Sequence, residues 1–200
     1  MRQHERQVTA ASVALLVGGY FVYRFYVKNK QLKSCWFHQI HLRAPKRDEI
    51  IIVRSSDEAN AAAEAIMAVN PACVGLDCEW VGKNKTALVQ ISAWMGNDSG
   101  VKCYLFRLCH FDLLTTAKLL ELLRHERIVK LGVGIDGDMK KLAKEFEPTI
   151  LNGVYFDLRH AAIHTKSVQA GGLASLVRQA LNRKLGKSLY LFLSAYFSIV

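Results

Sequence analysis

The stretch Cys-Val-Gly-Leu-Asp-Cys-Glu-Trp-Val, residues 73–81, places two acids, Asp77 and Glu79, inside a run of apolar and β-forming residues. Such a run predicts a strand, and in a strand the side chains of residues i and i+2 leave on the same face. Two carboxylates side by side repel each other, and burying them without a counter-charge is costly. A divalent metal ion is the usual counter-charge, so the stretch predicts a metal site.

The alternative for this stretch is an exposed edge strand with two hydrated acids. The opposite face of the expected strand argues against it, because that face is apolar. Its members are Val74, Leu76, Cys78 and Trp80.

Strand and helix patterns alternate through the rest of the chain from residue 50 onward. Strands are expected at residues 50–53, 73–80, 86–94, 102–107, 128–134 and 154–158. An Ala-rich helix is expected from a cap at residues 55–58 to about residue 69, and further helices at residues 113–124, 138–146, 159–165 and 172–182. Three successive strands followed by strand–helix alternation predict an α/β fold, with a mixed sheet flanked by helices.

A third candidate acid, Asp138, lies in the run from Lys130 to Leu142, where a strand passes through Gly132 and Gly134 into a helix. The Gly-Val-Gly sequence is not a phosphate loop, because no Lys-Ser or Lys-Thr follows at the required spacing. Capping of the helix is the structural alternative for an acid here. Asp136 suits that role better than Asp138, which lies one turn further in.

Three motifs together resemble the ribonuclease D-like 3′–5′ exonucleases of the DEDD superfamily. They are Leu-Asp-Cys-Glu-Trp at 76–80, Leu-Val-Gln-Ile-Ser at 88–92, and the run from Val129 to Leu142. The resemblance covers about residues 50–188 and implies a ribonuclease H-like fold. It also implies phosphodiester hydrolysis at single-stranded 3′ ends of DNA or RNA.

The resemblance further implies two Mg²⁺ or Mn²⁺ ions. Asp77 would bridge the two ions, Glu79 would bind the ion that carries the attacking water, and Asp138 would bind the other ion. Hard cations take oxygen ligands, which agrees with carboxylates in these three positions. Asp157 matches a family position whose acid is structural. The pair His160 and His164, spaced i, i+4 without the glutamate of a zinc protease, is also interpreted as structural.

The family pattern also requires a fourth Asp, with a Tyr or His four residues before it. In residues 1–200 no Asp follows Asp157 and no Glu follows Glu147. Residues 189–200, Leu-Tyr-Leu-Phe-Leu-Ser-Ala-Tyr-Phe-Ser-Ile-Val, are apolar in ten of twelve positions and none is acidic. We interpret this segment as an atypical tail, with a natural C-terminal strand or helix as the alternative. The departure puts the activity of this chain in doubt.

An uncharged run begins at Val8 and, apart from Arg24, continues to Val27, a length of 20 residues. This length suits a membrane-spanning helix, and Arg24 near one end can reach the interface. A cleaved signal peptide is the rival interpretation, but small residues are missing where cleavage would occur. The downstream flank is the more basic one, which places the following domain on the cytosolic side. The mitochondrial outer membrane is favoured, and the endoplasmic reticulum is the other option.

The net charge of +10 is uneven along the chain. Residues 1–49 carry nine Lys and Arg against three acids, and residues 50–200 carry eighteen against fourteen. The expected domain is therefore only mildly basic, which is compatible with a nucleic-acid enzyme without demanding one. Five cysteines without C-x-x-C spacing favour a reducing compartment.

These observations divide the chain into an anchor (1–30), a basic linker (31–49), an incomplete exonuclease domain (50–188) and the tail (189–200). The leading hypothesis is a membrane-anchored, metal-dependent 3′–5′ exonuclease. A catalytically impaired form that still binds nucleic acid or another partner is the first alternative. A membrane-tethered scaffold with relic acids is the second. The oligomeric state has no signal in the sequence.

Overall fold

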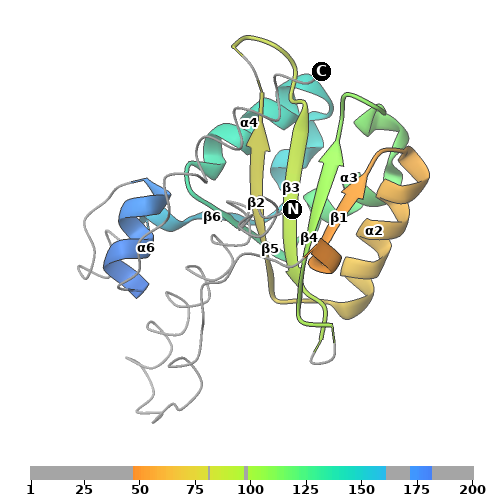
Figure 1. Cartoon of the computed structure of the whole chain (residues 1–200). Coiled ribbons are helices and arrows are strands. Elements are labelled where there is room, and N and C mark those ends of the chain that lie inside the picture. Colours follow the sequence, from red (N-terminus) through yellow and green to blue (C-terminus); the bar gives the residue numbers. More distant parts are fainter. Residues whose placement is uncertain (1–46, 81, 97–98, 161–171, 182–200) are drawn as a thin grey trace, which may run out of the picture.

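The computed structural model describes residues 47–80, 82–96, 99–160 and 172–181 (Figure 1). The expected anchor, the apolar tail and most of the basic linker lie outside these residues. Within the described part, no helix is long and apolar enough to cross a bilayer.

The described elements form an α/β arrangement with one mixed sheet and flanking helices, as the strand–helix pattern predicts. In chain order they are η2 (Arg47–Glu49), β1 (Ile50–Val53), α2 (Ser56–Val69), β2 (Cys73–Glu79), β3 (Leu88–Trp94), β4 (Val101–Arg107), η3 (Leu113–Thr115), α3 (Ala117–Arg124), β5 (Val129–Gly132), α4 (Ile135–Glu145), η4 (Pro148–Asn152), β6 (Tyr155–Asp157) and α6 (Leu173–Leu181).

The six strands lie in the order β1-β4-β3-β2-β5-β6. β3 is antiparallel to both β2 and β4, whereas β5 is parallel to both β2 and β6. The carboxyl ends of β2, β5 and β6 therefore meet at one edge of the sheet, which we call the carboxyl edge. Ligands of open α/β sheets bind beyond such an edge.

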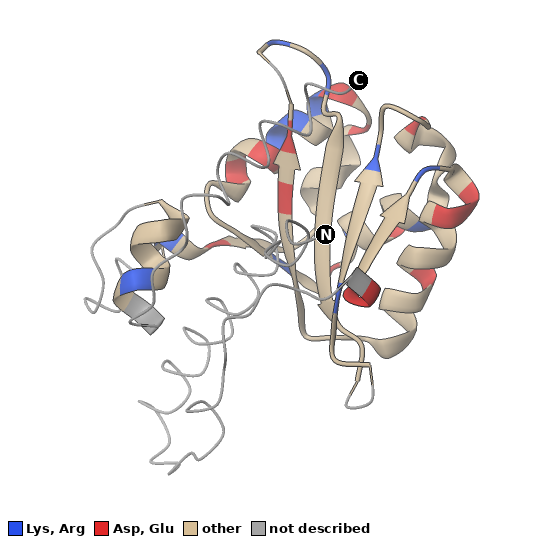
Figure 2. Cartoon of the chain, in the orientation of Figure 1, with Lys and Arg blue, Asp and Glu red and all other residues tan. Residues whose placement is uncertain are grey.

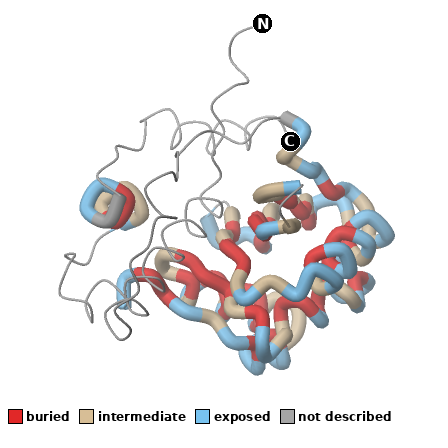
Figure 3. The backbone as a smooth tube through the Cα atoms, turned by 90° about the horizontal axis from the view of Figure 1, so that it is seen from below, coloured by how far each residue is buried: buried red, intermediate tan, exposed pale blue. Residues whose placement is uncertain are grey.

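The core lies between one face of the sheet and the helices α2, α3 and α4. Buried residues from β2, β3 and β4 meet buried residues from these helices in a single cluster. Figure 3 shows the buried stretches gathered where the sheet and the helices face each other. In β2 the residues that enter this core are Val74, Leu76 and Cys78, as alternation predicts.

Two expected helices differ from those observed. The helix expected at 113–124 is divided into η3 and α3 at Thr116, whose buried hydroxyl donates to the Leu113 carbonyl oxygen at 2.6 Å. Such local bonds from threonine compete with the helical ladder. The helix expected at 138–146 begins earlier, at Ile135, because Gly134 provides its N-cap in a left-handed conformation with φ of 81°. Asp136 is therefore not the cap.

Lys130 is fully buried in β5, and none of the acids that the structure describes lies against its ammonium group. Its Nζ donates instead to the carbonyl oxygens of His125 and Ile128, at 2.7 and 3.0 Å. Burial lowers the pKa of Lys130 from its ordinary value of 10.5 to about 8. The buried lysine ties the connection between α3 and β5 to the sheet.

This shifted pKa predicts a pH-dependent contribution to stability. Between pH 8 and 10.5 the unfolded chain holds the Lys130 proton and the folded chain releases it, so folding gains as pH rises through this window. The full gain is about 3 kcal/mol for a shift of this size. We expect the unfolding free energy of wild type, minus that of Lys130→Met, to rise across this window. Denaturant melts at several pH values measure it, and a pH-independent difference would contradict the burial argument.

Candidate active site

β2 presents Asp77 and Glu79 on the face opposite the core. Both side chains are half-buried, whereas Leu76 and Cys78, which alternate with them, are buried against the helices. Glu79 is the last residue of the strand. The two carboxylates therefore reach the carboxyl edge on one face, as the period of the strand predicts.

Two glycines bring α4 close to β2. A side chain at Gly132 would place its Cβ 2.7 Å from the Leu76 carbonyl oxygen, so only glycine allows β5 and β2 this approach. Gly134 then turns the chain into α4, whose first turn carries Asp138. The Asp138 side chain is buried, with 7% exposure. The close approach and the tight turn together put the third acid beside the strand that carries the first two.

Asp157, the last residue of β6, fixes this turn from the other side. One carboxylate oxygen accepts from the backbone N–H of Gly134 at 3.1 Å and from the Arg159 guanidinium at 2.6 Å. The other accepts from the backbone N–H of Arg159 at 2.9 Å. Burial alone would raise the pKa of Asp157, but the bonds from Arg159 and Gly134 outweigh it and lower the pKa. Asp157 thus has a structural role, because both of its carboxylate oxygens are hydrogen-bonded to the surrounding chain.

The three candidate acids interact strongly through space. Burial raises the pKa of Asp77 well above its usual value, and the charges of Asp138 and Glu79 raise it further. Burial, the charge of Glu79 and that of Asp157 raise the pKa of Asp138 to about 7, although Arg159 acts in the opposite direction. Burial also raises the pKa of Glu79. The site thus concentrates negative charge, which the charge of Arg159 acting at Asp138 offsets only in part.

The donor set suits a hard divalent cation, because the charges of Asp138 and Glu79 raise the pKa of Asp77 and the charge of Glu79 raises the pKa of Asp138. Among the residues that the structure describes, no three acid, histidine or cysteine side chains are already arranged around a common point for a metal. The fit therefore rests on ligand chemistry and on the unbalanced charge.

Two buried polar residues of β3 complete this face and carried no assigned role in the sequence. Gln90 pairs directly with Asp77 across the ladder, and Ser92 pairs with Gly75. Both are fully buried, and neither the Gln90 amide nor the Ser92 hydroxyl has a hydrogen-bond partner. A buried polar group without a partner is costly, which marks both positions as functional candidates. In the sequence, a glutamine among the apolar residues of an expected strand could have indicated this role.

The other sequence candidates do not join this group. Cys73, Cys78, Cys103 and Cys109 form no disulfide with one another, and Cys35 lies outside the described residues. The expected helix at 159–165 is described only at Leu158–His160, so the pair with His164 lies partly outside.

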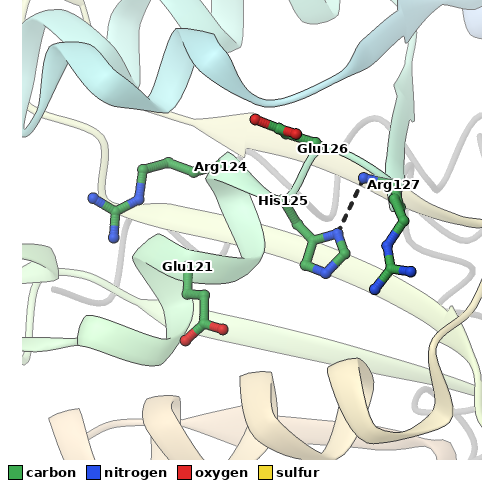
Figure 4. Close-up of a pocket in the computed structure, with 5 residues that line it drawn as sticks. All are labelled: Glu121, Arg124, His125, Glu126 and Arg127. Atoms are coloured by element: carbon green, nitrogen blue, oxygen red, sulfur yellow. Dashed lines mark hydrogen bonds between the residues drawn. The ribbon is translucent and has the colours of Figure 1, made fainter.

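A separate cavity of about 360 Å³ lies at the opposite edge of the sheet, at the end of α3 (Figure 4). It is lined by Glu121, Arg124, His125, Glu126 and Arg127. Its acids and bases offset one another, and Arg124 is paired with Glu147 outside the lining at 2.9 Å. The His125 ring nitrogen accepts from the backbone N–H of Arg127, at 3.2 Å. This cavity holds no comparable charge imbalance.

Comparison with known proteins places the chain among nucleases. A family model described as 3′–5′ exonuclease matches residues 50–191. Exonuclease 3′-5′ domain-containing protein 2 of Drosophila melanogaster is 31% identical over 118 residues, which is 57% of this chain and 19% of that protein. The human protein of the same name is 34% identical over 125 residues, which is 59% of this chain and 20% of that protein. The matched region thus spans about a fifth of these curated relatives.

Solved structures show the same fold. The exonuclease domain of Nibbler from Aedes aegypti superimposes with a TM-score of 0.57 at 20% identity, covering 72% of this chain and 73% of that one. The EXD2 exonuclease domain soaked in Mn and dGMP gives a TM-score of 0.50 at 23% identity, with coverages of 75% and 86%. The expected ribonuclease H-like exonuclease fold is therefore confirmed.

Proposed function

The chain belongs to the 3′–5′ exonuclease family, and from this we propose that it is a metal-dependent exonuclease acting on single-stranded 3′ ends of DNA or RNA. The observation that carries the proposal is the set of three mutually repelling acids, Asp77, Glu79 and Asp138, at the carboxyl edge. A divalent ion and a nucleotide as ligands are in keeping with the EXD2 exonuclease domain, whose crystal was soaked in Mn and dGMP.

In this proposal Asp77, Glu79 and Asp138 would hold the Mg²⁺ or Mn²⁺ ions through their carboxylate oxygens. Such ions, when bound, activate water and stabilise the leaving 3′ oxygen. The protein's own contribution is positioning. β2 fixes two carboxylates on one face, and the bonds from Gly134 and Arg159 to Asp157 fix the turn into the helix that carries the third. The charge of Arg159 also acts at Asp138, in the direction that lowers its pKa.

A direct test follows a single-stranded oligonucleotide labelled at its 5′ end. With the 200-residue chain and Mn²⁺ we expect slow, stepwise shortening from the 3′ end, abolished by EDTA and by Asp138→Asn. An oligonucleotide whose 3′ terminus is blocked should not be shortened. Shortening that continues in EDTA, or in Asp138→Asn, would contradict the assignment of these acids.

A second candidate is a catalytically impaired form that binds nucleic acid or another partner. It is favoured by one observation, that no acid follows Asp157 in residues 1–200 to act as the family's fourth carboxylate. The same assay separates the two. Retention of the oligonucleotide by the chain, with no shortening in either metal, supports this candidate.

We also propose that residues 8–27 anchor the chain in a membrane, the mitochondrial outer membrane, with the domain facing the cytosol. The run, uncharged apart from Arg24, and its basic downstream flank support this. Residues 1–30 fused to a fluorescent protein should stay with membranes through carbonate extraction. Full release into the soluble fraction would contradict the anchor.

A further inference from the structure

The connection between β2 and β3, residues 80–87, is fastened to α4. The backbone N–H and the hydroxyl of Thr86 both donate to Glu145, at 2.8 and 2.7 Å. Lys141 donates to the carbonyl oxygen of Asn84 at 3.0 Å and forms an ion pair with Glu145. Two segments that lie about sixty residues apart in the sequence therefore form one surface.

These contacts occupy Glu145, the acid of α4 that faces the connection. Burial alone would raise the pKa of Glu145, but the bonds from Lys141 and Thr86 outweigh it, so the pKa lies below its usual value. The carboxylate is thus ionised and its charge is matched by Lys141. The ammonium group of Lys141 also lies 4.9 Å from the centre of the Trp80 ring, which holds it further in place.

Four other lysines of the same surface remain available, and we call them the lysine strip. They are Lys83 and Lys85 on the connection, and Lys140 and Lys144 one turn apart on α4. All four are exposed, and none forms an ion pair with an acid of the described residues. Figure 2 shows the basic parts of the connection and of α4 close together at the same end of the sheet.

The lysine strip borders the candidate active site through the connection, which leaves β2 directly after Glu79. Lys140 and Lys144 neighbour in sequence the residues of α4, Lys141 and Glu145, that contact the connection. A group of unbalanced acids repels phosphates, whereas exposed lysines attract them. A negatively charged polymer whose end lies at the acids would therefore follow the strip rather than cross the rest of the carboxyl edge.

We propose that the lysine strip binds the phosphate backbone of a single strand on the 5′ side of the nucleotide held at the acids. This inference rests on the proposed function and adds the path of the substrate. Lysines act as point charges and contact no base edge, so the strip gives affinity without sequence preference. Binding should fall steeply with salt, since each phosphate contact releases counterions.

The test compares the full chain with a variant in which all four strip lysines are changed to Gln. Binding of a fluorescent 16-mer single-stranded DNA is followed by anisotropy in detergent and EDTA, which prevents hydrolysis, at several salt concentrations. At about 50 mM salt we expect the variant to bind at least about tenfold more weakly. The slope of log affinity against log salt should become shallower by roughly 3, the value for four contacts on a single strand.

A matched control removes four positive charges from other parts of the surface, at Arg54, Lys102, Lys118 and Arg127, each changed to Gln. It has the same net charge as the strip variant, so equal weakening in both would mean that only overall charge matters and would overturn the proposal. Thermal melting of both variants verifies that they are folded. An unchanged slope of log affinity against log salt in the strip variant would also overturn the proposal.

Exposed lysines can also bind the anionic headgroups of a lipid surface. Vesicles containing phosphatidylserine are therefore tested with the same proteins. A strip variant that loses vesicle binding but keeps single-stranded DNA binding would overturn the proposal in favour of a lipid surface. The outcomes also separate the two levels of inference. A chain that shortens DNA from the 3′ end while its strip variant binds normally refutes only the strip, whereas a wild-type chain that binds no DNA refutes both.

Discussion

Asp77→Asn is expected to abolish the binding of Mn²⁺ or Mg²⁺ while leaving the protein folded. The change removes one negative charge and keeps the shape of the side chain. Because Asp77 is the acid that would touch both ions, we expect its loss to weaken binding at least about a hundredfold. Isothermal calorimetry on the full chain in detergent measures the affinity directly. Glu79→Gln should act in the same direction.

A second measurement separates loss of a ligand from loss of the fold. In the metal-free protein Asp77 is buried close to Asp138 and Glu79, which raises its pKa and opposes its ionisation. Removing its charge should therefore keep or raise the thermal unfolding temperature of the metal-free chain. The matched control is Glu64→Gln, which removes an exposed acid of α2 and should change neither quantity. Unchanged metal affinity in both Asp77→Asn and Glu79→Gln would refute the two-metal proposal.

Replacing residues 189–200 with a family-like ending should raise the rate of 3′ shortening by at least about a hundredfold. The proposed ending is a helix with a Tyr and, four residues later, an Asp, so that both side chains lie on one helix face. The Asp would complete the carboxylate set, and the Tyr would orient the attacking water. Losing such positioning commonly costs two or more orders of magnitude in rate, roughly the gain expected here.

The control for this exchange is the same helical ending with Phe and Asn in place of Tyr and Asp. It reproduces any gain in solubility from removing the apolar segment but supplies neither chemical group. Rates on a 5′-labelled oligonucleotide with Mn²⁺ distinguish the three proteins. Rapid hydrolysis by the original chain, lost in Asp138→Asn, would show that three carboxylates suffice.

The sequence alone predicted the strands, the helices and the mixed character of the sheet, because apolar periodicity and turn residues are local signals. It misplaced the start of α4 because an acid was expected at the helix start, whereas Gly134 forms the N-cap without any side-chain bond. It also extended one helix through Thr116, where a buried hydroxyl bond interrupts the ladder. Both errors arise from single backbone positions that periodicity does not resolve.

For the site, the period of a strand was enough to place Asp77 and Glu79 side by side. Their proximity to Asp138 could not be derived from spacing and came only from the family resemblance, because it depends on the close approach at Gly132. The lysine strip was missed for a similar reason. The contacts of Thr86 and Lys141 that join its two halves are tertiary and leave no periodic trace in the sequence.

The strand order has a consequence for synthesis on the ribosome. Asp77 lies on β2, whose parallel neighbour β5 and the helix that carries Asp138 are made more than fifty residues later. Asp157, which fastens the turn, is made later still. A nascent chain that has emerged only through β4 carries two of the acids but not the third. The three acids can meet only after α4 has been made, so a shorter nascent chain does not yet carry the assembled candidate site.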